Sequence, residues 1–471
     1  MLKTLKIVIL LQVLLQLVLV IGAANAAEGA AKNAASLKPI LDVKTFVTPA
    51  GINVWLVEDT TSPAIYMDFA FRGAGAVNDP DGRQGVSQLL SNTLDEGAGR
   101  YDSKAFQAAL NDHSIGLNFS STRDDFGGHL DVLKKYQDTG FELLYLALSD
   151  PHLDAAAIER MKQANLSRIR SNMIDPDWLS ARLTNAVLFA GHPYARNSGG
   201  TLSQIPKITR DDLLHKFRTQ LAKDNLVVAV AGNISAADLS VKIDQVFGAL
   251  PDHATLATMT EVGFPTQSPV VHFKTDIEQN MVNICYAGMK LDDPDYTAAQ
   301  IFNYVAGGAG FGSRLMDEIR EKRGLTYGIY SGFQHMNHAE LWCVSGSTRA
   351  EQLEQMRDLV TKTLADFSQQ KITRAEFCAA RAHFIGSIPL GLTSNRDIAA
   401  MLNAFQLEHL PPNYLDLEQQ KLESLTLEDV EKASRRVLAS PPLATLIVGP
   451  NIEDAKTTEG VIFMLKLPDV E

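Results

Sequence analysis

The first half of the chain opens with alternating apolar and polar residues, which predict short strands at 53–58 and 64–71. Apolar residues then recur at helical spacing from Gly85 to about Leu94, directly after the breakers Gly82 and Gly85. The other elements predicted in this half are helices at 103–112, 131–148, 154–172, 209–220 and 236–250, and strands at 116–122 and 225–233.

The second half repeats this order of elements. A glycine-rich turn at Gly307–Gly312 is expected to let two backbones approach closely before a helix at 313–322. The other elements predicted here are strands at 270–273, 281–286, 327–333, 339–347 and 444–451, and helices at 296–305, 351–369 and 373–388 with further helical segments to 438. The simplest account is an α+β protein with two related halves of about 200 residues each.

The domain boundaries are predicted from changes in composition and from the positions of prolines. We expect an N-terminal half at 43–250, a linker at 251–269 that Pro251, Pro265 and Pro269 interrupt, and a C-terminal half at 270–471. A polar, alanine-rich spacer is predicted at 27–42.

Residues 1–26 have the pattern of a secretory signal. Lys3 and Lys6 precede an apolar run from Ile7 to about Ile21, and Ala24-Asn25-Ala26 offers a cleavage site. We therefore expect a periplasmic protein with no stable membrane anchor once the signal is cleaved. An uncleaved N-terminal membrane anchor is the alternative, although the apolar run is short for a full span.

Composition excludes some partners. The chain has 471 residues, 45% of them hydrophobic, and a formal net charge of −12, which argues against nucleic acid and anionic membrane surfaces as partners. Its three cysteines match no zinc motif. Cys285 and Cys343 fall in strand-like runs and Cys378 in a helix-like run, so buried free thiols are predicted, with a bridge between Cys285 and Cys343 left open.

The predicted helix at 85–94 carries the candidate chemistry. Gln88 and Asn92 are four residues apart and share one face, with Ser91 beside them. Taken alone, these are ordinary polar residues on an ordinary helix.

In its surroundings this helix resembles that of the pitrilysin/insulinase family of inverted zinc metallopeptidases. There a strand and a glycine-rich turn, here 71–75, lead to a Gly-x-x-His-x-x-Glu-His helix with two zinc ligands and a general base. The resemblance maps the ligands to Gln88 and Asn92 and the base to Ser91. The third ligand, a Glu within a Leu-x-Glu-Ile pattern, maps to Arg168 in 166–169.

All three ligands and the base are therefore replaced. A permanently charged guanidinium at a ligand position would repel Zn²⁺, so we expect no metal and no cofactor in this chain. A zinc enzyme with displaced ligands would have to use His113, His129 or His152, none of which has a His or Glu neighbour at helical spacing. The implied fold has two homologous halves of the metallopeptidase/mitochondrial processing peptidase-like type, each a mainly antiparallel sheet covered by helices.

A second family motif survives at 313–327. In the family, an Arg and a Tyr seven residues later hold the substrate peptide, and these positions map to Arg320 and Tyr327. The alternative is an amphipathic helix with i,i+4 pairs such as Glu318 with Lys322, capped by Gly324. The sequence His-Pro-Tyr at 192–194 also resembles the family's, and we expect His192 to be structural.

Some bacterial members of the family resemble split enzymes, in which one subunit carries zinc and a paired subunit keeps only the Arg and Tyr. This chain resembles the second subunit. The resemblance implies a heterodimer with a zinc-bearing paralogue that hydrolyses short or unfolded peptides, which bind partly by adding to a strand edge. On its own the chain would be inactive. The alternative is a non-enzymatic peptide-binding or scaffold protein.

Overall fold

The computed structural model describes residues 39–369, 372–450, 460–464 and 466–467. The signal predicted at 1–26 and nearly all of the spacer at 27–42 lie outside the described residues. In the part that is described, none of the helices has the length and apolar character needed to cross a membrane.

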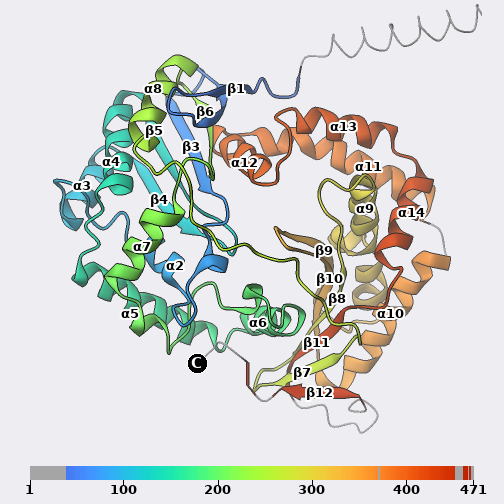
Figure 1. The fold of residues 1–471 in the computed structure, drawn as a ribbon. Coiled ribbons are helices and arrows are strands. Elements are labelled where there is room, and N and C mark those ends of the chain that lie inside the picture. Colours follow the sequence, from blue (N-terminus) through green and yellow to red (C-terminus); the bar gives the residue numbers. More distant parts are fainter. Residues whose placement is uncertain (1–38, 370–371, 451–459, 465, 468–471) are drawn as a thin grey trace, which may run out of the picture. The chain divides into compact units, whose positions relative to one another are not determined.

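The first half forms a six-stranded sheet in the order β1-β2-β6-β3-β5-β4 (Figure 1). Only β2 and β6 pair in parallel; the other neighbours are antiparallel. The strands are β1 (Lys44–Val47), β2 (Asn53–Glu58), β3 (Ala64–Phe71), β4 (Gly116–Ser121), β5 (Phe126–Leu133) and β6 (Leu226–Gly232).

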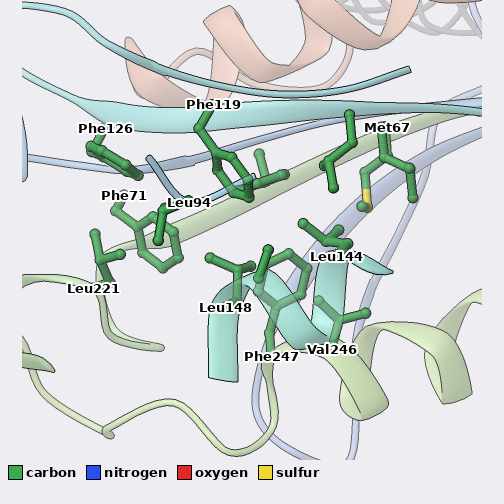
Figure 2. Packing of buried hydrophobic residues seen from close by; sticks show 14 of the residues in the cluster. Met67, Phe71, Leu94, Phe119, Phe126, Leu144, Leu148, Leu221, Val246 and Phe247 are labelled. Carbon is green, nitrogen blue, oxygen red and sulfur yellow. The ribbon is translucent and has the colours of Figure 1, made fainter. Parts of the chain in front are cut away.

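One face of this sheet is covered by helices of the same half. Alternate side chains of β3, including Met67 and Phe71, point into a core shared with Leu144 and Phe247 on two of these helices (Figure 2). The helices of this half are α2 (Val86–Ser91), α3 (Ser103–Asp112), α4 (Gln137–Ser149), α5 (Ala155–Asn172), α6 (Pro176–Leu188), α7 (Arg210–Gln220) and α8 (Ala236–Phe247).

The second half forms another six-stranded sheet, in the order β12-β7-β11-β8-β10-β9. Its strands are β7 (Val270–Lys274), β8 (Asn280–Ala287), β9 (Ile329–Met336), β10 (Ala339–Thr348), β11 (Ala444–Gly449) and β12 (Val461–Met464). Its helices are α9 (Tyr296–Asn303), α10 (Leu353–Gln369), α11 (Arg374–Ser387), α12 (Asn395–Leu407), α13 (Tyr414–Ser424) and α14 (Leu427–Val437).

The two sheets share one strand order. Along the first sheet β2, β6, β3, β5 and β4 follow one another, and β7, β11, β8, β10 and β9 do so along the second. The predicted α+β fold with two mainly antiparallel halves is confirmed. The boundaries at 250 and 270 stay a prediction.

Each half also lends a helix to the other half's sheet. Helix α6 of the first half lies against β8 and β11, and helix α12 of the second half lies against β3 and β6. Asn283 of β8 donates to the hydroxyls of Ser180 and Thr184 on α6, at 3.0 and 3.2 Å. Gln406 of α12 donates to the Val228 carbonyl at 3.0 Å. The halves are therefore tied by exchanged helices as well as by the linker.

Three predictions about local structure are wrong. The helix expected from residue 131 begins only at Gln137, because 126–133 form strand β5, which pairs with both β3 and β4. The segment Gly307–Gly312 was expected to be a turn before a helix. Instead, its first two residues belong to a π-helical turn, Tyr304–Gly308, that continues α9. The close approach is real: a side chain on Gly307 would meet the backbone of Ser331 at 2.6 Å.

The third wrong prediction concerns the thiols. Cys285 and Cys343 form a disulfide, because β8 and β10 place them directly opposite each other. This disulfide is buried in an apolar cluster with Leu179 and Leu183 of α6. Cys378 is a free cysteine but is exposed rather than buried.

Candidate functional site

Helix α2, the candidate site helix, is held from behind by a buried ion pair. The Asp79 carboxylate accepts from the backbone N–H groups of Gly85 and Ser87 at 2.8 and 3.0 Å, and from the Ser87 hydroxyl. The Lys216 ammonium of α7 lies 3.5 Å from this carboxylate and donates to the Gly75 carbonyl at 3.1 Å. Burial lowers the pKa of Lys216 to about 8, against the opposing effect of Asp79. Position and direction of α2 are thus fixed.

The open face of α2 carries a chain of neutral side chains. The Gln88 amide donates to the Asn92 carbonyl oxygen at 3.0 Å, and the Ser91 hydroxyl donates to the Gln88 backbone carbonyl at 2.9 Å. The Asn92 amide in turn donates to the side-chain oxygen of Asn165 on α5, at 2.9 Å. The structure therefore brings Gln88, Ser91 and Asn92 together and ties them to α5.

Arg168 lies one turn beyond Asn165 on the same helix face. Its side chain is exposed, and its Nη2 atom lies 3.2 Å from the place that a Cβ on Gly199 would occupy. The side-chain oxygen of Asn197 lies 3.6 Å from that same place. Arg168 and Asn197 thus flank the loop that approaches the start of α2, where Gly85 and Gly200 are in contact.

These residues do not fit a zinc ion. Zn²⁺ requires lone pairs from His, Cys or carboxylate groups, whereas here the amides are engaged with each other and the remaining group is a guanidinium. Across the described residues, no three His, Cys, Asp or Glu side chains gather so that they could hold a metal ion. His113 and His152 are each engaged with a backbone carbonyl at 2.8 Å.

The second predicted motif lies on the surface of the other half. Arg320 is in a π-helical turn, Met316–Glu321, and its guanidinium lies 4.5 Å from the ring centroid of Phe311. It also pairs with Glu321. Tyr327 is 81% exposed and Phe311 is 70% exposed. Folding alone does not account for these exposed aromatic rings.

The other charged residues of this motif form ion pairs along the helix, as the alternative of an amphipathic helix predicted. Lys322 pairs with Glu318, and Arg323 reaches the same carboxylate at 2.7 Å. Gly324 has a φ of +62° and donates to the Arg320 carbonyl at 2.8 Å, closing the helical turn. Within the described chain, no hydrogen bond or ion pair joins Arg320 to Tyr327 or either of them to the α2–α5 residues.

His192 belongs to a buried junction between the halves and not to a reactive centre. It accepts from the Tyr194 N–H at 3.1 Å and contacts the Thr260 carbonyl at 3.0 Å. The Tyr194 hydroxyl donates to Asp124 at 2.5 Å and accepts from the backbone of His338 in the β9–β10 turn at 3.2 Å. Burial lowers the pKa of His192, so its ring is neutral at neutral pH.

Sequence reasoning missed Asn165, Asn197 and the pair formed by Asp79 and Lys216. Asn165 alone left a local signal, because it is a polar residue three positions before Arg168 in a run of helical spacing. The pairing of Asp79 with Lys216 and the contact of Asn197 with Gln84 join segments far apart in the chain, so no local pattern reports them.

Two different family models match the two halves of the chain. The family model described as Insulinase (Peptidase family M16) matches residues 60–198, and the model described as Peptidase M16 inactive domain matches residues 207–384. A Helicobacter pylori protein named Non-peptidase homolog YmxG is 28% identical over 394 residues, which are 82% of this chain and 88% of that protein.

Solved structures are similar over most of the chain. A crystal structure from Pseudomonas fluorescens, described as a peptidase M16 inactive domain, is 30% identical with a TM-score of 0.81, covering 87% of this chain and 99% of the other. A protease from Helicobacter pylori has a TM-score of 0.78 at 16% identity, covering 88% of this chain and 100% of the other, and this likeness concerns the fold alone.

Proposed function

This chain belongs to the insulinase family of peptidases, M16, and from that premise we propose that it is the non-catalytic, substrate-binding subunit of a heteromeric zinc metallopeptidase. Its partner is a paralogue that carries the zinc motif, and the two form a heterodimer. The substrates are peptides in the cell envelope, in keeping with the secretory pattern of residues 1–26. The partner supplies the metal, the attacking water and the general base.

The observation that carries this proposal is the set of side chains at positions 88, 91, 92 and 168, which differ from the zinc ligands and general base expected there. Position 168 holds an exposed guanidinium, and the amides at 88 and 92 are hydrogen-bonded to each other and to Asn165. A site of this kind has no base for water and no ligand for zinc. Hydrolysis by the chain alone is therefore not expected.

The exposed groups at 311–327 support a substrate-binding role. The guanidinium of Arg320 is held against the Phe311 ring, and the Tyr327 ring is open to solvent. Both polar ends donate hydrogen bonds that suit a peptide carbonyl, whose oxygen becomes negative as water attacks it. We assign them to the substrate when it lies at the partner's zinc.

The alternative is a non-enzymatic peptide-binding or scaffold protein. One observation favours it: the Helicobacter pylori relative is named a non-peptidase homologue. A pure scaffold, however, has no use for a half-buried arginine and an exposed tyrosine in the same motif.

The test is reconstitution. The purified chain, a zinc-motif paralogue from the same organism and an equimolar mixture are assayed for zinc content and for hydrolysis of an unfolded fluorogenic peptide. We expect no activity and no zinc in the chain alone, and an activity in the mixture that exceeds that of the paralogue alone at least about ten-fold.

A matched control uses the paralogue with its general base changed from Glu to Gln, which should abolish turnover in the mixture. Activity of the chain alone would contradict the proposal. A mixture no more active than the paralogue would favour the scaffold alternative.

A further inference from the structure

We propose that the former metal site at α2 and α5 has become a carboxylate-binding site for a bound peptide. The position that holds a metal ligand in relatives carries the opposite charge here, and its neighbours present N–H donors. This inference rests on the proposed peptide-binding function and names the group that the site recognises.

The first step is that the side chains at this site present hydrogen-bond donors and a positive charge. In relatives the three ligand positions supply lone pairs to a cation. In this chain two of them are amides, and the third is Arg168, which has five N–H donors and no acceptor. A positive group with surrounding donors selects an anion or another acceptor, and the carboxylate is the anion that every peptide carries.

The second step is that two buried donors have no partner. Asn165 is 3% exposed and Asn197 is 8% exposed, and the side-chain nitrogen of each makes no hydrogen bond in the described structure. The oxygen of the Asn165 amide is fixed by Asn92, and that of Asn197 accepts from the Gly199 N–H at 3.2 Å. Both amides are therefore oriented, with their nitrogens left to meet an acceptor. A buried donor without a partner is unfavourable, which a ligand oxygen would correct.

The third step is that Arg168 is not engaged within the chain. No hydrogen bond or ion pair of its side chain occurs among the described residues, whereas Arg320 contacts both Glu321 and Phe311. Arg168 lies on the same face of α5 as Asn165 and flanks the same loop as Asn197. A carboxylate can pair with the exposed guanidinium of Arg168, and it can accept from the amide nitrogens of Asn165 and Asn197 once the side chains that cover these nitrogens move aside.

The experiment measures binding of Ala-Ser-Val peptides, labelled at the N-terminus with the uncharged dye 7-methoxycoumarin, to the full chain by fluorescence anisotropy at low salt. Three uncharged-backbone probes are compared: the peptide with a free C-terminal carboxylate, the same peptide with a C-terminal amide, and the amidated peptide with a single internal Glu added. The variants are Arg168→Gln and, as a matched control, Arg170→Gln, another exposed arginine of α5.

We expect the free acid to bind about ten-fold more tightly than the amide, and Arg168→Gln to remove this difference while Arg170→Gln keeps it. If the internal Glu restores tight binding to the amidated peptide, the site takes side-chain carboxylates; if it does not, the site takes the C-terminus. Either result supports a carboxylate site.

Equal binding of acid and amide by the wild-type chain would overturn the carboxylate site while leaving peptide binding intact. The same would follow if Arg168→Gln and Arg170→Gln behaved alike. Failure of all three probes to bind would overturn both the carboxylate site and the peptide-binding function. Thermal melting of both variants checks that they are folded.

Discussion

The two halves share a strand order but treat their polar groups in opposite ways. The first half buries charges around helix α2, with Lys216 only 1% exposed beside Asp79. The second half keeps its distinctive groups on the surface, with Tyr327 81% exposed. On the proposed function, the first half keeps the frame of a catalytic site without its ligands. In the second half, the exposed rings of Phe311 and Tyr327 are not part of the hydrophobic core.

The sheet faces covered by the exchanged helices α12 and α6 also differ in polarity. Helix α12 lies over a polar face of the first sheet, where Arg396 pairs with Asp131 close to Asp68. Helix α6 lies over an apolar face of the second sheet, where Cys285 and Cys343 are bridged. Beneath α12 the first sheet thus carries an ion pair, whereas beneath α6 the second sheet carries a covalent bridge.

The strongest test of the comparison is to restore the metal site. We expect the variant Gln88→His, Ser91→Glu, Asn92→His, Arg168→Glu to gain about one zinc per chain, because Asp79 still holds the start of α2 and α2 still packs against α5. Metal content after dialysis, measured by atomic emission, reports the gain.

The same variant with Arg168 retained is the control and should take up no zinc. If the fourfold variant is folded by circular dichroism yet stays free of metal, the frame of the site has changed along with its ligands.

Removing the buried cation should destabilise the first half. Lys216→Met leaves the Asp79 carboxylate without its counter-charge, and we expect a loss of about 3–5 kcal/mol in the free energy of unfolding. The matched control is Lys322→Met, which breaks exposed pairs with Glu318 and Asp317 and should cost less than about 1 kcal/mol. Urea unfolding measures both. Similar losses in the two variants would contradict the contrast between buried and exposed charges.

The smallest effect concerns pH. Burial raises the pKa of Asp68 to about 6, above the value near 3.9 expected in the unfolded chain. The folded state then binds the proton more tightly, so this group's contribution lowers the stability as pH rises from about 4 to 6. Because Asp68 is partly exposed, we expect Asp68→Asn to stabilise the chain at pH 7 by only about 1 kcal/mol.

Thermal melting at pH 5 and pH 7 tests this expectation. The gain from Asp68→Asn should be smaller at pH 5 than at pH 7. A gain that is equal at the two pH values would show that titration of Asp68 is not its source.

The sequence predicted the positions of most strands and of α2, because alternation and helical spacing are local patterns. It failed at β5, where Gly127 and Gly128 weaken the strand signal and pairing on both sides decides the structure. The Cys285–Cys343 bridge could only be left open, since it depends on the register of β8 against β10. The resemblance points to replaced ligand and base positions at 88, 91, 92 and 168, and this stays a prediction. It gives no sign of the amide bridge to Asn165, because that bridge joins two helices distant in sequence.

The measurement that tests the central claim most directly is peptide turnover by the reconstituted complex carrying Arg320→Ala or Tyr327→Phe in this chain. The account predicts that each variant lowers turnover about ten- to hundred-fold while the complex elutes unchanged in size-exclusion chromatography, because a group that contacts the reacting carbonyl is lost. Arg323→Ala, which removes a neighbouring charge of the same motif, should have little effect. Unchanged turnover in both variants would contradict the claim that this chain binds the substrate.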